Sequence, residues 1–177
     1  MVILSDNEIK RYIEKGKIGI SPYEESNVQG ASVDFRLGRG FLVPPNYYGD
    51  FAKEEGIVIS LDSKVKYEEV DDSEIILPPG HFILGTTLEK LTIPDFLCGE
   101  VGGKSGVARK ALNIENAGHL GPGFEGQITL ELYNGLAFPI KLKEGDGICQ
   151  VQFHELSSAA TKIYRGKFQN QEGPKAN

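Results

Sequence analysis

Residues 127–133 read QITLELY, and this stretch decides the fold that we expect. Its even-numbered residues are isoleucine or leucine, whereas Gln127, Thr129 and Glu131 are polar. Alternation with a period of two is typical of a β-strand that has one face in the core. We therefore predict a strand over Ile128–Tyr133. A half-solvated strand would explain the pattern by itself, and Glu131 becomes a candidate proton carrier if its face lines a cleft.

Similar short runs, rich in Val, Ile, Phe, Tyr and Thr, recur along the rest of the chain, where 22 glycines and 9 prolines separate them. This density of strands and turns indicates a mainly β fold, as a sandwich, a jelly roll or a distorted barrel. The further predicted strands are Ser32–Leu37, Gly40–Val43, Ile57–Leu61, Glu74–Leu77, Phe82–Leu88 and Ile148–Phe153.

One short helix is predicted near the N-terminus. Ser5 and Glu8 have the spacing of a capping box, in which each side chain bonds the other residue's amide. Apolar residues then follow at helical spacing from Ile9, and Gly16 ends the run.

Size and charge limit the function classes. A chain of 177 residues predicts one domain, and a net charge of −6 argues against a nucleic-acid partner. No apolar run is long enough to span a membrane and no secretory signal is visible, so the cytoplasm is the expected location. Cys98 and Cys149 each lie in an apolar run and predict two reduced, core-facing thiols. The three histidines lack metal-ligand spacing, so zinc is not expected.

Two glycine-rich segments could carry chemistry. Residues 102–109, GGKSGVAR, contain Gly-Lys-Ser, but a P-loop would need glycine where Cys98 stands. The segment still suits phosphate, with Lys104 and Arg109 as cations, and a solvated turn fits its composition equally well. Residues 118–126, GHLGPGFEG, form a tight loop that could offer backbone groups to a flat ring.

Five segments together resemble the dCTP deaminase family of the dUTPase superfamily. In chain order they are ILSDNEI (3–9), QGASVDFRLG (29–38), GKSGVAR (103–109), PGFEGQITLELYN (122–134) and YRGKFQNQEGP (164–174). The resemblance implies a dUTPase-like distorted β-barrel or jelly roll over residues 1–160, with a flexible arm, residues 161–177, closing over the site. It also implies a homotrimer with sites between subunits.

The resemblance implies a zinc-free deamination of dCTP to dUTP and ammonia. Glu131 would be the general acid/base, while Ser105 and Arg109 would orient the attacking water and hold the carboxylate. The residues to which it gives a substrate-binding role are Lys104, Ser105, Gly106, Arg109, Gly118, Gly121, Thr129, Leu130, Gln150, Tyr164, Lys167 and Gln171. The expected ligands are dCTP and dUTP, with Mg²⁺ on the triphosphate and dTTP as a candidate inhibitor.

The sequence departs from the family pattern most at Gly121. The family has an Asp there, which receives the deoxyribose 3′-hydroxyl and, in diphosphatases, helps to position water. Lys104 replaces the usual Arg and cannot form a bidentate fork. Three functions therefore stay open: a dCTP deaminase, a dUTP diphosphatase alone or combined with deamination, and a catalytically weak nucleotide-binding trimer. Gly121 argues against strong dUTP hydrolysis.

Overall fold

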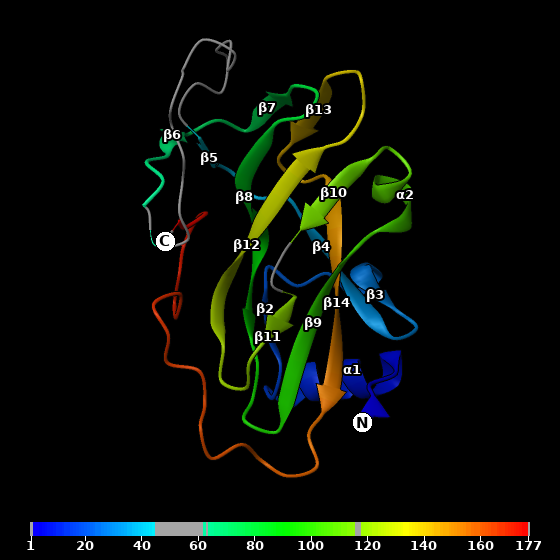
Figure 1. Ribbon diagram of the computed structural model, residues 1–177. Coiled ribbons are helices and arrows are strands. Elements are labelled where there is room, and N and C mark those ends of the chain that lie inside the picture. Colours follow the sequence, from blue (N-terminus) through cyan, green and yellow to red (C-terminus); the bar gives the residue numbers. More distant parts are fainter. Residues whose placement is uncertain (1, 45–61, 63, 116–117, 177) are drawn as a thin grey trace.

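The computed structural model describes residues 2–44, 62, 64–115 and 118–176. In this part the chain is mainly β, with two six-stranded sheets and one two-stranded sheet (Figure 1). The helices are α1 (Asp6–Glu14), the 3₁₀ turn η1 (Glu25–Asn27) and α2 (Ser105–Ala108). The predicted strand Ile57–Leu61 lies outside the described residues.

The first sheet has the strand order β11-β9-β14-β4-β3, and β1 pairs with β14 beside this path. Its neighbouring strands are antiparallel. Their bounds are β1 (Val2–Ile3), β3 (Val28–Gln29), β4 (Ser32–Arg36), β9 (Leu97–Gly103), β11 (His119–Leu120) and β14 (Gly147–Glu155).

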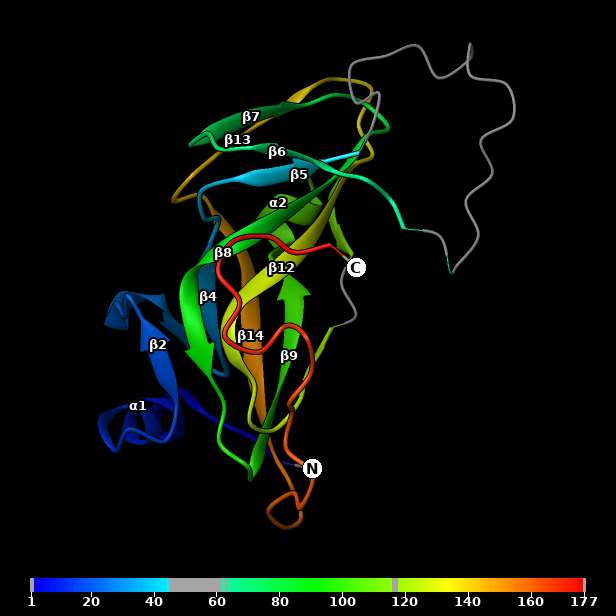
Figure 2. The same ribbon diagram turned by 90° about the vertical axis from the view of Figure 1, so that its left-hand side faces the viewer.

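The second sheet has the order β10-β12-β8-β5-β6, with β2 paired to β8, and β7 and β13 form the small sheet (Figures 1 and 2). In the described part of the chain the sheets do not close into a barrel, so the jelly-roll form of the prediction describes them better. The bounds are β2 (Gly19–Ser21), β5 (Phe41–Val43), β6 (Glu68–Val70), β7 (Glu74–Leu77), β8 (Phe82–Thr92), β10 (Leu112–Glu115), β12 (Glu125–Asn134) and β13 (Ile140–Lys143).

The core lies between the two large sheets. Val151 and Phe153 of β14 belong to the same buried cluster as Leu130 and Leu132 of β12, and all four side chains are fully buried. The predicted alternation of β12 is confirmed, because residues 126–134 alternate between buried and half-buried. Burial of such a two-sided apolar layer is the main source of stability in a fold of this kind.

The N-terminal helix is confirmed, but its predicted capping box is wrong. α1 begins after Ser5, and Gly16 follows it with φ +62°. Ser5 makes no side-chain capping bond, and Glu8 forms an ion pair with Arg11 instead. A carboxylate held one turn further along the helix cannot reach back to the amide of Ser5.

The two cysteines lie in the core. Cys98 and Cys149 are free and buried, as expected. Burial raises the pKa of the Cys149 thiol, which keeps it protonated and unreactive.

Within the described ranges, no helix has the length and apolar character that crossing a membrane requires.

An irregular stretch in β8 fixes the register of β12. Gln127 pairs with Lys90 and Thr129 with Thr86, so β8 carries two more residues than β12 between these pairs. The Thr87 hydroxyl accepts a hydrogen bond from the Ile128 amide at 2.9 Å, and Gln127 Nε2 donates to the Thr87 carbonyl at 2.8 Å. These hydrogen bonds pair backbone groups that have no partner in the interrupted β8–β12 ladder.

Gly38 supports this stretch, because the chain after β4 passes directly over it. The Gly38 amide donates to the Thr86 carbonyl at 2.8 Å, and a Cβ at residue 38 would lie 2.7 Å from the Thr87 carbonyl oxygen. We expect Gly38→Ala to lower the free energy of unfolding in urea by about 1–3 kcal/mol. Gly30→Ala is the matched control, since a Cβ there meets no atom within 4 Å. Equal stability of the two variants would contradict this account.

Candidate active site

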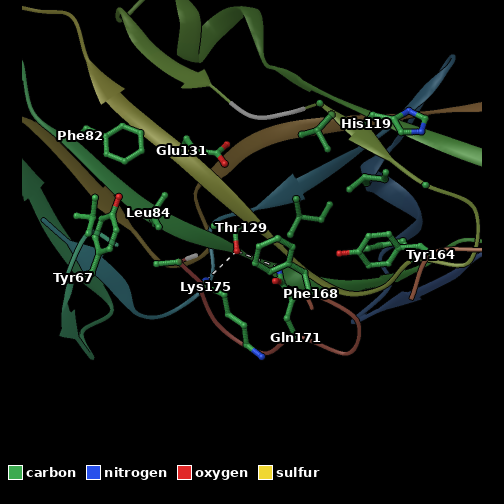
Figure 3. Close-up of a pocket in the computed structure, with 18 residues that line it drawn as sticks. Tyr67, Phe82, Leu84, His119, Thr129, Glu131, Tyr164, Phe168, Gln171 and Lys175 are labelled. Atoms are coloured by element: carbon green, nitrogen blue, oxygen red, sulfur yellow. Dashed lines mark hydrogen bonds between the residues drawn. The ribbon is translucent and has the colours of Figure 1, made fainter. Parts of the chain in front are cut away.

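A cavity of about 680 Å³ lies beside the polar face of β12, under the C-terminal arm (Figure 3). β12 supplies Glu131 and Thr129, the segment around β11 supplies backbone and His119, and the arm covers the remainder. The sequence-predicted residues that line it are Gly118, Gly121, Thr129, Glu131, Tyr164 and Gln171.

Glu131 is half-buried and lies between polar and apolar walls. Its cross-strand neighbour on β8 is Leu84, and Phe82 lies two residues before it on the same strand. Figure 3 shows the Glu131 carboxylate between Phe82 on one side and His119 on the other. A carboxylate with this mixed surrounding is shielded from bulk water yet reachable by a ligand, as a general acid/base must be.

The C-terminal arm, residues 161–176 of the described chain, runs along β12 and hydrogen-bonds to it. The Gln127 amide donates to the Gln171 carbonyl at 3.0 Å, and the Gly173 amide donates to Gln127 Oε1 at 2.7 Å. The Lys175 amide donates to Thr129 Oγ1 at 3.1 Å. The arm therefore uses the polar face of β12 next to Glu131 as its docking surface.

Gln171 is the most deeply buried polar residue of the arm, with 2% of its surface exposed. Its Nε2 donates to the Gln127 carbonyl and, at 3.2 Å, to Thr129 Oγ1. Its Oε1 is buried and has no hydrogen-bond partner among the described residues. A buried acceptor beside a cavity is costly unless a ligand or water satisfies it, so Gln171 offers a polar contact to whatever enters.

Gly121 and Tyr164 form the other end of the wall. The Tyr164 amide donates to the Pro122 carbonyl at 2.6 Å, and its ring lies 5.8 Å from that of Phe124. A Cβ at residue 121 would lie 3.7 Å from Tyr164 Cβ, an ordinary contact, and the φ of Gly121 is not in the left-handed region. Neither the backbone nor the packing therefore requires glycine here.

The remaining predicted polar residues form a second group, the outer cluster, defined as Lys104, Ser105, Gly106, Arg109 and Gln150. None of them lines the cavity of its own chain. Ser105, Gly106 and Arg109 are exposed on or just after α2. Gln150 lies on β14, on the face of the first sheet that points away from the core.

Two contacts hold the outer cluster in place. Lys104 Nζ lies 2.6 Å from Asp34 Oδ2, and Ser32 Oγ donates to Gln150 Oε1 at 3.2 Å. Asp34 and Gln150 are cross-strand partners in the β4–β14 ladder, which explains why the two contacts lie side by side. A phosphate at Lys104 would therefore compete with the Asp34 carboxylate for the same cation.

Two predicted substrate-binding residues, Leu130 and Lys167, do not line the cavity. The Leu130 side chain is fully buried on the core face of β12, so only its backbone could contact a ligand there. The alternation that exposes Thr129 and Glu131 turns Leu130 away. Lys167 does not line the cavity, and its ammonium lies 4.9 Å from the ring centre of Phe168.

Sequence reasoning missed several residues of the wall. Phe82 and Leu84 come from the second sheet, Tyr67 directly precedes its strand β6, and Phe168 and Lys175 come from the arm. Phe168 lies inside the quoted motif 164–174 and Lys175 directly follows it, so both could have been found from that motif. The wall residues of the second sheet are set by strand pairing between distant segments, which leaves no local signal.

The described residues include no group of three or more His, Cys, Asp and Glu side chains that could hold a metal ion.

Comparison with known proteins gives a consistent picture. A sequence model of the family described as dCTP deaminase-like matches residues 3–156. A protein of a Sulfurihydrogenibium species is 39% identical over 99% of this chain and 96% of its own length, and one of Persephonella marina is 40% identical over the same shares. Both are named dCTP deaminase, dUMP-forming.

Among solved structures, the 2′-deoxycytidine 5′-triphosphate deaminase of Agrobacterium tumefaciens has a TM-score of 0.66 at 21% identity. The match covers 86% of this chain and 47% of that one. At this identity the likeness supports the fold, in agreement with the mainly β jelly-roll architecture described above.

The docked arm generates a prediction at Thr129. Thr129→Val removes the acceptor of the Lys175 amide and of Gln171 Nε2 but keeps the side-chain shape. We expect hydrogen exchange at the Lys175 amide to accelerate by about 3- to 10-fold, the equivalent of one hydrogen bond. Thr92→Val, at an exposed end of β8, is the matched control. Unchanged exchange at Lys175 would show that the arm does not depend on this hydroxyl.

Proposed function

Since the chain belongs to the dCTP deaminase-like family, we propose that it deaminates dCTP hydrolytically, with Glu131 as the general acid/base, and cleaves the resulting dUTP to dUMP. The observation that carries the proposal is the Glu131 carboxylate in a cavity of about 680 Å³ that the C-terminal arm covers. A half-solvated strand face, the alternative reading of the sequence, would not have enclosed it.

In the proposed deamination, the ionised Glu131 removes a proton from a water molecule, whose oxygen attacks C4 of the cytosine ring. The same carboxyl then delivers this proton to N3. It next takes the proton of the new C4 hydroxyl and passes it to the C4 amine, which leaves as ammonia. The C–N bond breaks, the former water oxygen remains as the C4 carbonyl, and Glu131 is ionised again. A positioned acid/base of this kind contributes about 10²–10⁴-fold in rate.

We further propose that the active unit is a homotrimer with sites between subunits. The outer cluster cannot reach the cavity of its own chain, so its Ser105 and Arg109 serve Glu131 of a neighbouring copy. Lys104, Gly106 and Gln150 would accompany them and approach the phosphates. A closed cyclic oligomer satisfies this arrangement, because each chain gives its cavity to one interface and its outer cluster to another.

The arm is proposed to act as a lid over the bound nucleotide. Tyr164 and Gln171 already line the cavity, and Lys167 would need to turn from Phe168 toward the triphosphate. Closing a lid excludes water from the reacting base and strengthens electrostatic contacts. The nucleotide is expected to arrive with Mg²⁺ on its phosphates, and dTTP, which shares the sugar and triphosphate, is a candidate inhibitor of the same site.

Two products are possible, and different observations favour them. The full-length relatives at about 40% identity are named dUMP-forming, which supports cleavage of dUTP after deamination. Gly121 supports release of dUTP, because it offers no carboxylate for the sugar or for a water at phosphorus. We adopt dUMP as the proposed product, in place of the dUTP predicted from the sequence, because these relatives match nearly the whole chain.

Product analysis tests this function directly. We expect the purified protein with dCTP and Mg²⁺ to release ammonia and pyrophosphate together, and with dUTP to release pyrophosphate. Glu131→Gln should lower the rate of ammonia release by about 10²–10⁴-fold while keeping nucleotide affinity, because an amide preserves shape but cannot accept the proton. Ammonia without pyrophosphate would restore dUTP as the product. Nucleotide binding with neither product would favour the weak binding trimer.

A mixing experiment tests the shared site. Glu131→Gln and Ser105→Ala alone are each expected to be inactive, since every site lacks one partner. After co-refolding in equal amounts, about one quarter of the sites should combine an intact Glu131 with an intact Ser105 and recover activity. Mixing Ser105→Ala with Arg109→Ala is the negative control, because both changes lie in the outer cluster and no assembled site then has this cluster intact. Absence of recovery in the first mixture would contradict sites between subunits.

A further inference from the structure

Tyr67 lies in the cavity although no motif pointed to it. It directly precedes β6, and the pairing β6-β5-β8-β12 brings it to the same face as Glu131. Its side chain is half-buried, and Figure 3 shows it beside Leu84 and near Phe82, on the Glu131 side of the cavity. The strand order of the second sheet therefore brings Tyr67 to the cavity from outside the arm.

This wall is otherwise apolar. This part of the described wall consists of the hydrocarbon side chains of Val65, Phe82 and Leu84, and Tyr67 adds a hydroxyl to it. Burial raises the pKa of Tyr67, and the negative charge of Glu131 raises it further. The phenol consequently stays protonated at neutral pH and is a hydrogen-bond donor facing the carboxylate's end of the cavity.

We propose that Tyr67 is a positioning residue for the reaction, whose hydroxyl donates a hydrogen bond toward the Glu131 carboxylate. The proposal rests on the proposed function of Glu131. A donor of this kind favours the ionised form, so it lowers the pKa of Glu131 and keeps the base active at lower pH. Tyr67 itself neither gains nor loses a proton in the cycle.

Other titratable side chains share the cavity and must be separated from this effect. Among the described residues that line it, these are His119, Tyr164 and Lys175. Each is unchanged when only the Tyr67 hydroxyl is removed. The difference between the pH profiles of the parent protein and Tyr67→Phe therefore isolates that hydroxyl.

The test is the pH dependence of kcat/KM for ammonia release from dCTP. Without the donor, the pKa of Glu131 rises, so less carboxylate is present in acid. For Tyr67→Phe we expect a loss of about 3- to 10-fold near pH 5, no loss near pH 8 and an unchanged KM. Tyr133→Phe is the matched control, because Tyr133 lies two residues from Glu131 on the same strand and does not line the cavity.

A second measurement does not need turnover. A ¹³C NMR titration of the Glu131 carboxyl, assigned with Glu131→Gln, should give a higher pKa in Tyr67→Phe than in the parent protein and in Tyr133→Phe. Equal values would overturn the role of Tyr67 whether or not the protein deaminates dCTP. The role of Tyr67 would also be overturned if the parent protein is active and the kcat/KM profile of Tyr67→Phe superimposes on the parent profile. A reduction of kcat/KM by the same factor at every pH would overturn it too. Failure of the proposed function shows separately, as a parent protein that releases no ammonia.

Discussion

The alternation of side chains along β12 is the constraint on which the rest of the structure depends. One face of this strand is fully buried at Leu130 and Leu132 and holds the two large sheets together. The opposite face carries Thr129 and Glu131, which line the cavity. A shift of one residue in register would move the carboxylate into the core and the leucines into the cavity, so stability and chemistry are tied to the same register.

The polar face of β12 is itself divided between two tasks. Gln127 and Thr129 are occupied by the arm, whose amides at Gly173 and Lys175 donate to their side-chain oxygens. Glu131, further along, is beyond the last of these bonds and faces the cavity. The contacts of the arm at Gln127 and Thr129 are thus separate from the β8–β12 ladder, which positions the carboxylate, and the proposed movement of the arm would leave Glu131 in place.

The sequence predicted the longer alternating strands, but it missed short strands such as β10 and β13 and the glycine-rich β9. β12 and β7 were found because apolar and polar residues alternate or β-branched residues dominate. β9 was missed because three of its seven residues are glycine, and the reason for one of them is tertiary. A Cβ at Gly99 would lie 3.0 Å from Ile93 Cδ1 and 3.3 Å from Leu120 Cβ, a tight packing that glycine relieves and that no local pattern reveals.

The candidate site was predicted only in part, again because contacts between distant segments leave no local pattern in the sequence. Motif residues such as Glu131 and Gln171 are local features of the chain, and the structure brings them to one cavity. Ser105 and Arg109 stand in an equally clear motif but lie on the outer cluster, because β9 carries them past the cavity to α2. Their separation from Glu131 within one chain is the reason why we propose that a second copy completes the site, and the motifs alone do not reveal this separation.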